Sequence, residues 1–151
     1  MKKQSINLTK KQFKSLLKVV YLGNWMVNAY RTDDTNEEYE SIEDLIFSYA
    51  PQFGFEKYIS HEEADGDKYY PTNDFEETTD VHKLHEAYDE ETFWDELAER
   101  LGERDFLEKY SKKEIEDMKR DEWFIKLEEC IEKYNEEFEK KGLERIRKET
   151  N

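Results

Sequence analysis

The chain has 151 residues, of which 24 are Lys or Arg and 39 are Asp or Glu, so its formal net charge is −15 at pH 7. High charge with only 36% hydrophobic residues is typical of disordered segments, but a 15% aromatic content is not. We therefore expect a folded protein, with one domain over residues 1–151. Five Gly, two Pro and one Cys exclude collagen-like, low-complexity and disulfide-framework folds.

Neither export nor membrane insertion is expected. Lys2 and Lys3 are not followed by the apolar stretch or the cleavage site of a secretory signal. The longest apolar stretch, residues 16–30, contains Lys18 and is shorter than the roughly 20 residues that cross a bilayer. Cys130 has no second Cys to pair with and is expected to be a small core residue. The sequence therefore predicts a cytoplasmic protein that does not associate with membranes.

Helix-start signals occur along most of the chain. They are the capping boxes of Thr9 with Gln12, Thr35 with Glu38, Asn73 with Glu76 and Ser111 with Glu114, and the capping residue Asp89. Pro51 is expected to end the second helix. Gly142 is expected to end the last helix in a left-handed conformation.

The helical periodicity fails between residues 53 and 73. Residues 55–59 and 69–71 resemble two short extended segments around a turn at Gly66. The expected fold is therefore mainly α: a single-domain bundle of about four to five helices, with an irregular or short β-hairpin insert around residues 53–73.

The final helix is amphipathic. Its apolar residues recur at alternating spacings of three and four and are Phe124, Leu127, Ile131, Tyr134 and Phe138. Packing into the protein's own core is the favoured interpretation, because Glu122 breaks the heptad pattern that a sustained coiled coil requires. A homodimer seam along this helix is the alternative.

The charge is unevenly distributed. Residues 1–31 hold seven basic residues and no acidic one, residues 32–110 have a net charge of −20, and residues 111–151 have a net charge of −2. An acid-rich, hydrated surface explains the middle segment without a function. The functional interpretations are a recognition face for a basic protein, a cation site, and a mimic of the charge of nucleic acid. Direct binding of nucleic acid is not expected.

Asn24 and Asn28 are polar exceptions in an apolar helix. They lie one turn apart, and Arg31 follows on the same face. Such residues commonly tie neighbouring segments to the core through hydrogen bonds. The alternative is a polar pocket in which Arg31 binds an anion or a carboxylate.

Two histidines suggest a weaker hypothesis. His82, His85, Glu86 and Asp89 have helical spacings, and imidazole with carboxylate ligands suits zinc or iron. In a chain with 39 acids, however, almost any His has a carboxylate at such a spacing. No nucleotide-binding glycine motif or nucleophile motif is present, so no cofactor is predicted.

The favoured hypothesis for function is a non-enzymatic interaction or regulatory module that binds a basic protein through its acidic surface. A metal-dependent hydrolase with a carboxylate and histidine site is one alternative. An inhibitor that mimics nucleic acid is another.

Overall fold

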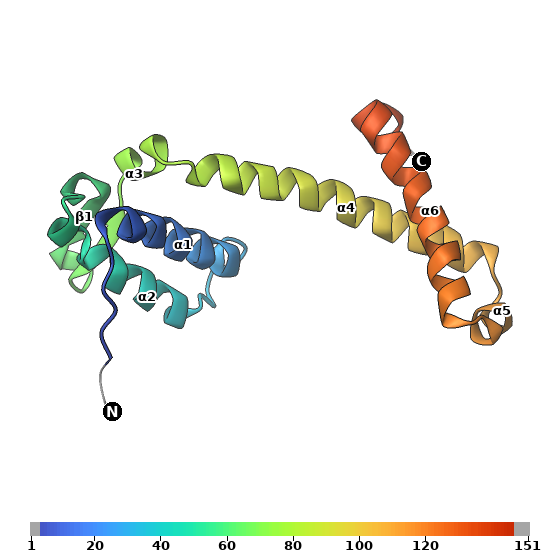
Figure 1. The fold of residues 1–151 in the computed structure, drawn as a ribbon, viewed down its shortest axis with the longest axis horizontal. Coiled ribbons are helices and arrows are strands. Elements are labelled where there is room, and N and C mark those ends of the chain that lie inside the picture. Colours follow the sequence, from blue (N-terminus) through green and yellow to red (C-terminus); the bar gives the residue numbers. More distant parts are fainter. Residues whose placement is uncertain (1–3, 147–151) are drawn as a thin grey trace. The chain divides into compact units, whose positions relative to one another are not determined.

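The computed structural model describes residues 4–146, apart from the side chains of Asp65 and Arg145 (Figure 1). It is 75% helical, and its described part has six α-helices and one two-stranded antiparallel sheet, so the prediction of a mainly α fold with a short hairpin is confirmed. The contacts group the chain into two compact units that divide between Glu86 and Ala87. The single domain over residues 1–151 stays a prediction, because this grouping does not test whether the units unfold together.

The N-terminal unit is built on a pair of helices. α1 (Lys10–Asn28) and α2 (Glu37–Ser48) lie side by side and antiparallel, joined by a short loop (Figure 1). The capping box predicted at Thr9 is present. The cap of α2 is Asn36 and not Thr35, because the Asn36 side chain is the one that accepts a hydrogen bond from the Glu38 backbone N–H. The predicted start was therefore one residue early.

The segment after α2 forms the predicted hairpin. α2 ends before Pro51, which lies in the 3-10 turn η1 (Ala50–Phe53). A second such turn, η2 (Glu56–Tyr58), leads into strand β1 (Ile59–Glu62), which pairs antiparallel with β2 (Lys68–Pro71). Gly66 makes the turn between them, after η3 (Glu63–Asp65), with a φ of 79° that glycine adopts readily.

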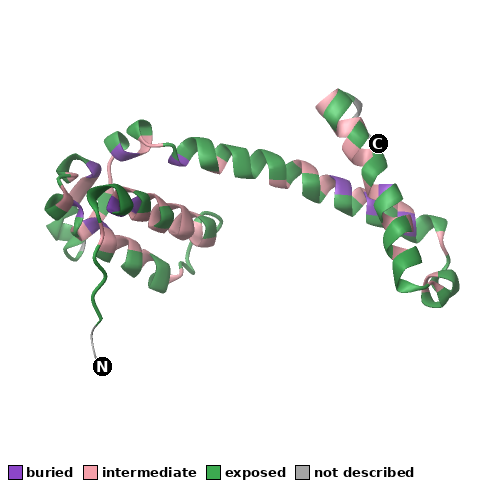
Figure 2. Ribbon diagram, in the orientation of Figure 1, coloured by how far each residue is buried: buried purple, intermediate pink, exposed green. Residues whose placement is uncertain are grey.

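The core of the N-terminal unit is largely aromatic. Its buried residues are Phe13, Leu17, Phe47, Ala50, Tyr58, Phe75 and Val81 (Figure 2). Phe75 comes from the short helix α3 (Asn73–Thr78), and its ring meets those of Phe47 and Tyr58 edge-on, with centroids 5.2 and 5.5 Å apart. Burying one such side chain contributes about 1.5–3 kcal/mol. α3 is capped by Thr72, whose hydroxyl accepts from the Phe75 N–H, and not by Asn73 as predicted.

The predicted helix start at Asp89 is wrong. α4 runs without a break over Val81–Lys109 and so passes through both units. A capping residue stabilises a helix end only where the preceding residues leave the helical conformation. The residues before Asp89 include Lys83, Leu84, Glu86 and Ala87, which favour the helix and carry it through.

The C-terminal unit is formed by the rest of α4 with α5 (Lys112–Asp117) and α6 (Arg120–Lys141). α6 crosses α4 at Gly102, where a Cβ would lie 2.6 Å from Ile131 Cγ1 and 2.8 Å from the Ile131 backbone. Only a glycine permits so close an approach. Cys130, beside this crossing in the sequence, is buried as expected, and so are Ala98 and Phe106.

Two details of the C-terminal unit differ from the predictions. The capping box at Ser111 is present, but it opens the short α5, and the long helix begins afresh at Arg120. The break between them brings the Trp123 ring edge-on to Phe106, with centroids 6.0 Å apart, so packing outweighs local helix propensity there. Gly142 has a φ of 49° but a ψ of −131°, outside the left-handed helical region that the sequence predicted.

No helix among residues 4–146 is both long enough and apolar enough to span a bilayer.

Candidate functional site

A groove of about 600 Å³ lies within the N-terminal unit. Its lining residues come from α1, from the loop that follows it, from α2 and from β2. The lining side chains are carboxylates, aromatic rings and small polar groups, with a single basic residue. They are Tyr21, Asn24, Trp25, Thr35, Glu37, Glu40, Ser41, Glu43, Asp44, Lys68, Tyr69, Tyr70 and Pro71. The groove therefore combines negative charge with aromatic surface.

The carboxylates of the groove come from one helix. Glu37, Glu40 and Asp44 are spaced by three and four residues, which places them on the same face of α2, and Glu43 lies beside them. Lys68 is the only basic residue that lines the groove. No ion pair links any of these four acids to a basic side chain among the residues that the structure describes.

Glu43 is the most perturbed carboxyl group of the groove. Its Oε2 accepts a hydrogen bond of 2.6 Å from the Asn24 side-chain amide. Burial raises the pKa of Glu43 from 4.5 to about 7, and the neighbouring charges of Glu40 and Asp44 add to this effect, while the Asn24 hydrogen bond opposes it. A substantial share of this carboxyl is therefore still protonated near neutral pH.

Backbone and tyrosine contacts fix the walls of the groove. Asp44 Oδ1 accepts a 2.7 Å hydrogen bond from the Tyr69 backbone N–H and so holds β2 against α2. The Tyr21 hydroxyl donates to Glu76 Oε1 at 2.8 Å. Burial, together with the Glu76 carboxylate, raises the pKa of Tyr21 well above its usual range, so Tyr21 is a neutral phenol.

The structure brings Asn24 and Asn28 together. Asn28 Nδ2 donates to Asn24 Oδ1 at 2.7 Å, and Asn28 Oδ1 accepts from the Asn36 backbone N–H at 2.7 Å. Asn28 thereby ties the start of α2 to the end of α1, while Asn24 continues the chain of hydrogen bonds to Glu43 in the groove. The two asparagines thus form a continuous chain of hydrogen bonds from the interhelical loop to the groove.

Arg31 lies in the loop and does not line the groove. Its Nε donates to the Val27 carbonyl at 3.0 Å, and its Nη1 donates to the Asp34 carboxylate at 2.8 Å. Arg31 therefore already has a carboxylate partner within the loop. An anion pocket of Asn24, Asn28 and Arg31 stays a prediction that these contacts do not test.

The histidines at the start of α4 contact other side chains. His82 Nε2 lies 3.5 Å from Glu76 Oε2, and the His85 ring rests on Trp25, with centroids 3.8 Å apart. In the described part of the chain no group of three or more His, Cys, Asp and Glu side chains is arranged to hold a metal ion. A metal site of His82, His85, Glu86 and Asp89 stays a prediction.

Among the site residues predicted from the sequence, only Asn24 lines the groove. The acids of α2 belong to the acidic segment of residues 32–110, whose net charge alone does not predict that they share a face. Their spacing was the available signal, because positions 37, 40 and 44 repeat at three and four. The contribution of Tyr69 and Tyr70 had no such signal, since it depends on the hairpin folding back against α2.

Comparison of the chain with protein-family profiles, with curated proteins and with solved structures gives no significant match.

Proposed function

We propose that this protein is a non-enzymatic interaction module of the cytoplasm that binds a basic segment of a partner protein in the acidic groove of its N-terminal unit. The observation that carries the proposal is the lining of the groove, where four carboxylates and four aromatic residues surround a space of about 600 Å³ with one lysine. That volume falls within the roughly 300–1,000 Å³ of ordinary ligand sites.

The chemistry of the groove suits a guanidinium or ammonium group. Glu37 and Glu40 offer carboxylate oxygens, which bind Arg through paired, charge-assisted hydrogen bonds. Tyr69 and Tyr70 also line the groove, and although one face of the Tyr69 ring is stacked on His61, with centroids 4.4 Å apart, an aromatic face left open to the groove would attract a cation by about 0.5–2 kcal/mol. An Arg or Lys side chain would place its apolar stem against the rings and its charge among the carboxylates.

The proposal predicts that the protonation of Glu43 changes when a ligand binds in the groove. A cation beside Glu43 favours its charged form, so binding lowers the pKa of Glu43 from about 7. At pH 6.5, where Glu43 of the free protein is largely protonated, binding of a cation is therefore expected to release part of a proton. An acidic or neutral ligand would leave this proton in place.

A peptide-binding measurement tests the proposal. Isothermal titration calorimetry would use an Arg-rich nonapeptide and an acidic nonapeptide of equal length. The double variant Glu37→Gln with Glu40→Gln should weaken Arg-peptide binding by roughly tenfold or more, since it removes two facing charges. Glu38→Gln is the matched control, because Glu38 lies on the same helix but does not line the groove.

The outcomes separate specific from diffuse charge attraction. If the double variant loses only about twice the binding free energy that Glu38→Gln loses, in proportion to the two charges removed against one, the attraction depends on net charge alone and the groove is refuted as the site. Absence of binding to the Arg-rich peptide would refute the proposal entirely. The two alternatives from the sequence, a metal-dependent hydrolase and a mimic of nucleic acid, remain untested predictions.

A further inference from the structure

The pair of helices α1 and α2 exposes large apolar side chains on the surface of the N-terminal unit. Six of them are between 43% and 74% exposed, and they are Val19, Met26, Tyr30, Tyr39, Ile42 and Tyr49. Exposed apolar residues scattered singly need no explanation, whereas a contiguous patch commonly marks an interaction surface. An interaction surface at this site therefore requires that the six residues be contiguous.

Helical spacing and a shared groove place them on one face. Positions 16, 19, 23, 26 and 30 repeat at three and four along α1 and its end, and positions 39, 42, 46 and 49 do so along α2. Leu16 and Val19 of the first stripe line the same apolar groove of about 630 Å³ as Ile46 and Tyr49 of the second. The two stripes therefore run side by side, and we call them together the apolar face.

The apolar face carries no charge along its centre. α1 has no charged residue between Val19 and its end at Asn28, although 42% of the whole chain is charged. Gly23 lies in the middle of its stripe, and a Cβ added there would meet nothing within 4 Å. A gap of this kind allows a second helix to approach closely. The centre of the face is thus suited to helix packing and unsuited to a basic or acidic ligand.

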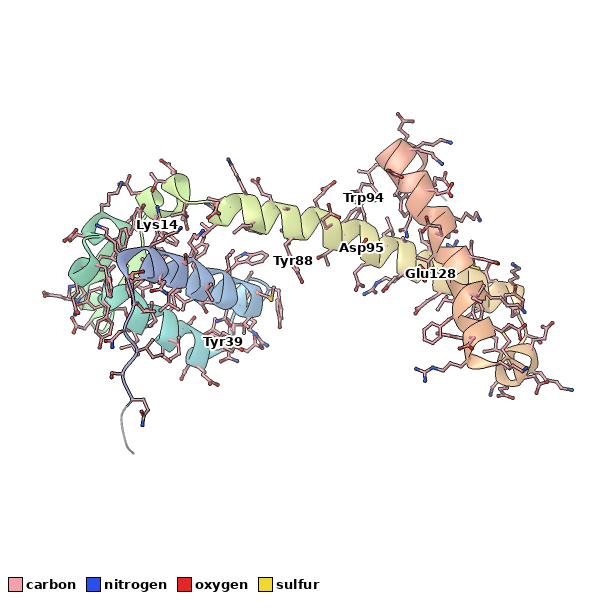
Figure 3. All side chains as sticks on the ribbon, in the orientation of Figure 1. Lys14, Tyr39, Tyr88, Trp94, Asp95 and Glu128 are labelled. Carbon is pink, nitrogen blue, oxygen red and sulfur yellow. The ribbon has the colours of Figure 1, made fainter. Side chains whose placement is uncertain are left out.

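The two ends of the helix pair carry opposite charges. Lys11 lies at the start of α1, one turn before Ser15, which lines the apolar groove, and Glu38 lies at the start of α2, one turn before Ile42. Because the helices are antiparallel, these starts are at opposite ends, which Lys14 and Tyr39 mark in Figure 3. A two-fold axis across the helices would therefore bring the basic end of one copy to the acidic end of another.

We propose that the apolar face docks a second copy of this chain, so that α1 and α2 of both copies form an isologous four-helix dimer. An isologous interface requires a self-complementary surface, which an uncharged centre with oppositely charged ends provides. From their exposed fractions, the six side chains expose on the order of 600 Å² per copy, near the roughly 800 Å² of a standard interface.

The dimer would leave the acidic groove open. Positions 37, 40 and 44, which face the groove, lie on the side of α2 opposite to positions 39, 42, 46 and 49. Each dimer would thus present two grooves, and a partner with two basic segments would bind with the added strength of bivalency. The dimer itself does not depend on what the groove binds.

Sedimentation velocity over a range of protein concentrations tests this proposal. The wild type should sediment as a dimer, and the variant Val19→Glu with Met26→Glu should sediment as a monomer. Ile125→Glu is the control, because Ile125 of α6 is 61% exposed and belongs to the C-terminal unit, outside the apolar face. This control variant should stay dimeric.

A second pair of substitutions distinguishes loss of the dimer from loss of folding. Tyr30→Glu with Tyr39→Glu changes the other end of the apolar face and should also give a monomer, with the helical circular dichroism of the wild type. A monomeric wild type would overturn the proposal. A dimer that survives both double variants, or that only Ile125→Glu dissociates, would overturn it as well.

Discussion

The Glu43 carboxyl should make the protein less stable as the pH rises from 5 to 8. Its pKa is about 7 in the folded protein against 4.5 in the unfolded chain. Between these values the folded state holds a proton that the unfolded state has lost, so the free energy of unfolding falls with increasing pH. Each pKa unit corresponds to about 1.36 kcal/mol, and after a reduction for the partial exposure of Glu43 we expect an effect of about 2 kcal/mol.

Glu43→Gln isolates this effect. The amide of Gln does not titrate, and its oxygen can still accept the hydrogen bond that Asn24 now donates to Glu43. The stability of the variant relative to the wild type should therefore rise by about 2 kcal/mol between pH 5 and pH 8. Urea denaturation followed by circular dichroism at both pH values measures the difference.

Glu38→Gln serves as the control, because Glu38 is exposed and lies outside the groove. Its stability relative to the wild type should be the same at the two pH values. If Glu43→Gln behaves like this control, Glu43 has an ordinary pKa and the electrostatic description of the groove is wrong.

Three further predictions follow from the packing. Gly102→Ala should destabilise the protein by about 1–3 kcal/mol in urea denaturation, because the new Cβ collides with the Ile131 backbone; an unchanged stability would refute the close crossing. Asn28→Ala should cost about 1–3 kcal/mol by leaving the Asn36 N–H without its partner, and an unchanged denaturation midpoint would contradict this. Ser111→Ala should lower hydrogen-exchange protection in the C-terminal unit alone, and a fall in both units would show one cooperative domain.

Local signals in the sequence predicted the fold class and several boundaries. The capping boxes at Thr9 and Ser111 are both present, because a cap depends on residues three positions apart and little else. The hairpin was predicted from the loss of helical periodicity and from Gly66, whose positive φ the turn requires. These features are decided within a few residues of the chain.

The features that the sequence did not predict depend on distant contacts. Asp89 resembles a cap, but the helix formers around it keep α4 continuous. The break after α5 arises where Trp123 packs against Phe106. The groove requires β2 to be held against α2 by Asp44 and Tyr69, which are 25 residues apart. Among the predicted site residues, only Asn24 was found to line it.

The ionisation of Glu43 with and without a basic peptide tests the central claim most directly. Carbon-13 NMR of the Glu43 carboxyl should give a midpoint near 7 for the free protein. Saturation with the Arg-rich nonapeptide should lower that midpoint, since a bound cation stabilises the carboxylate, while the acidic nonapeptide should leave it unchanged. A midpoint that stays near 7 when the Arg-rich peptide is bound would contradict the proposal that the acidic groove binds a cationic segment.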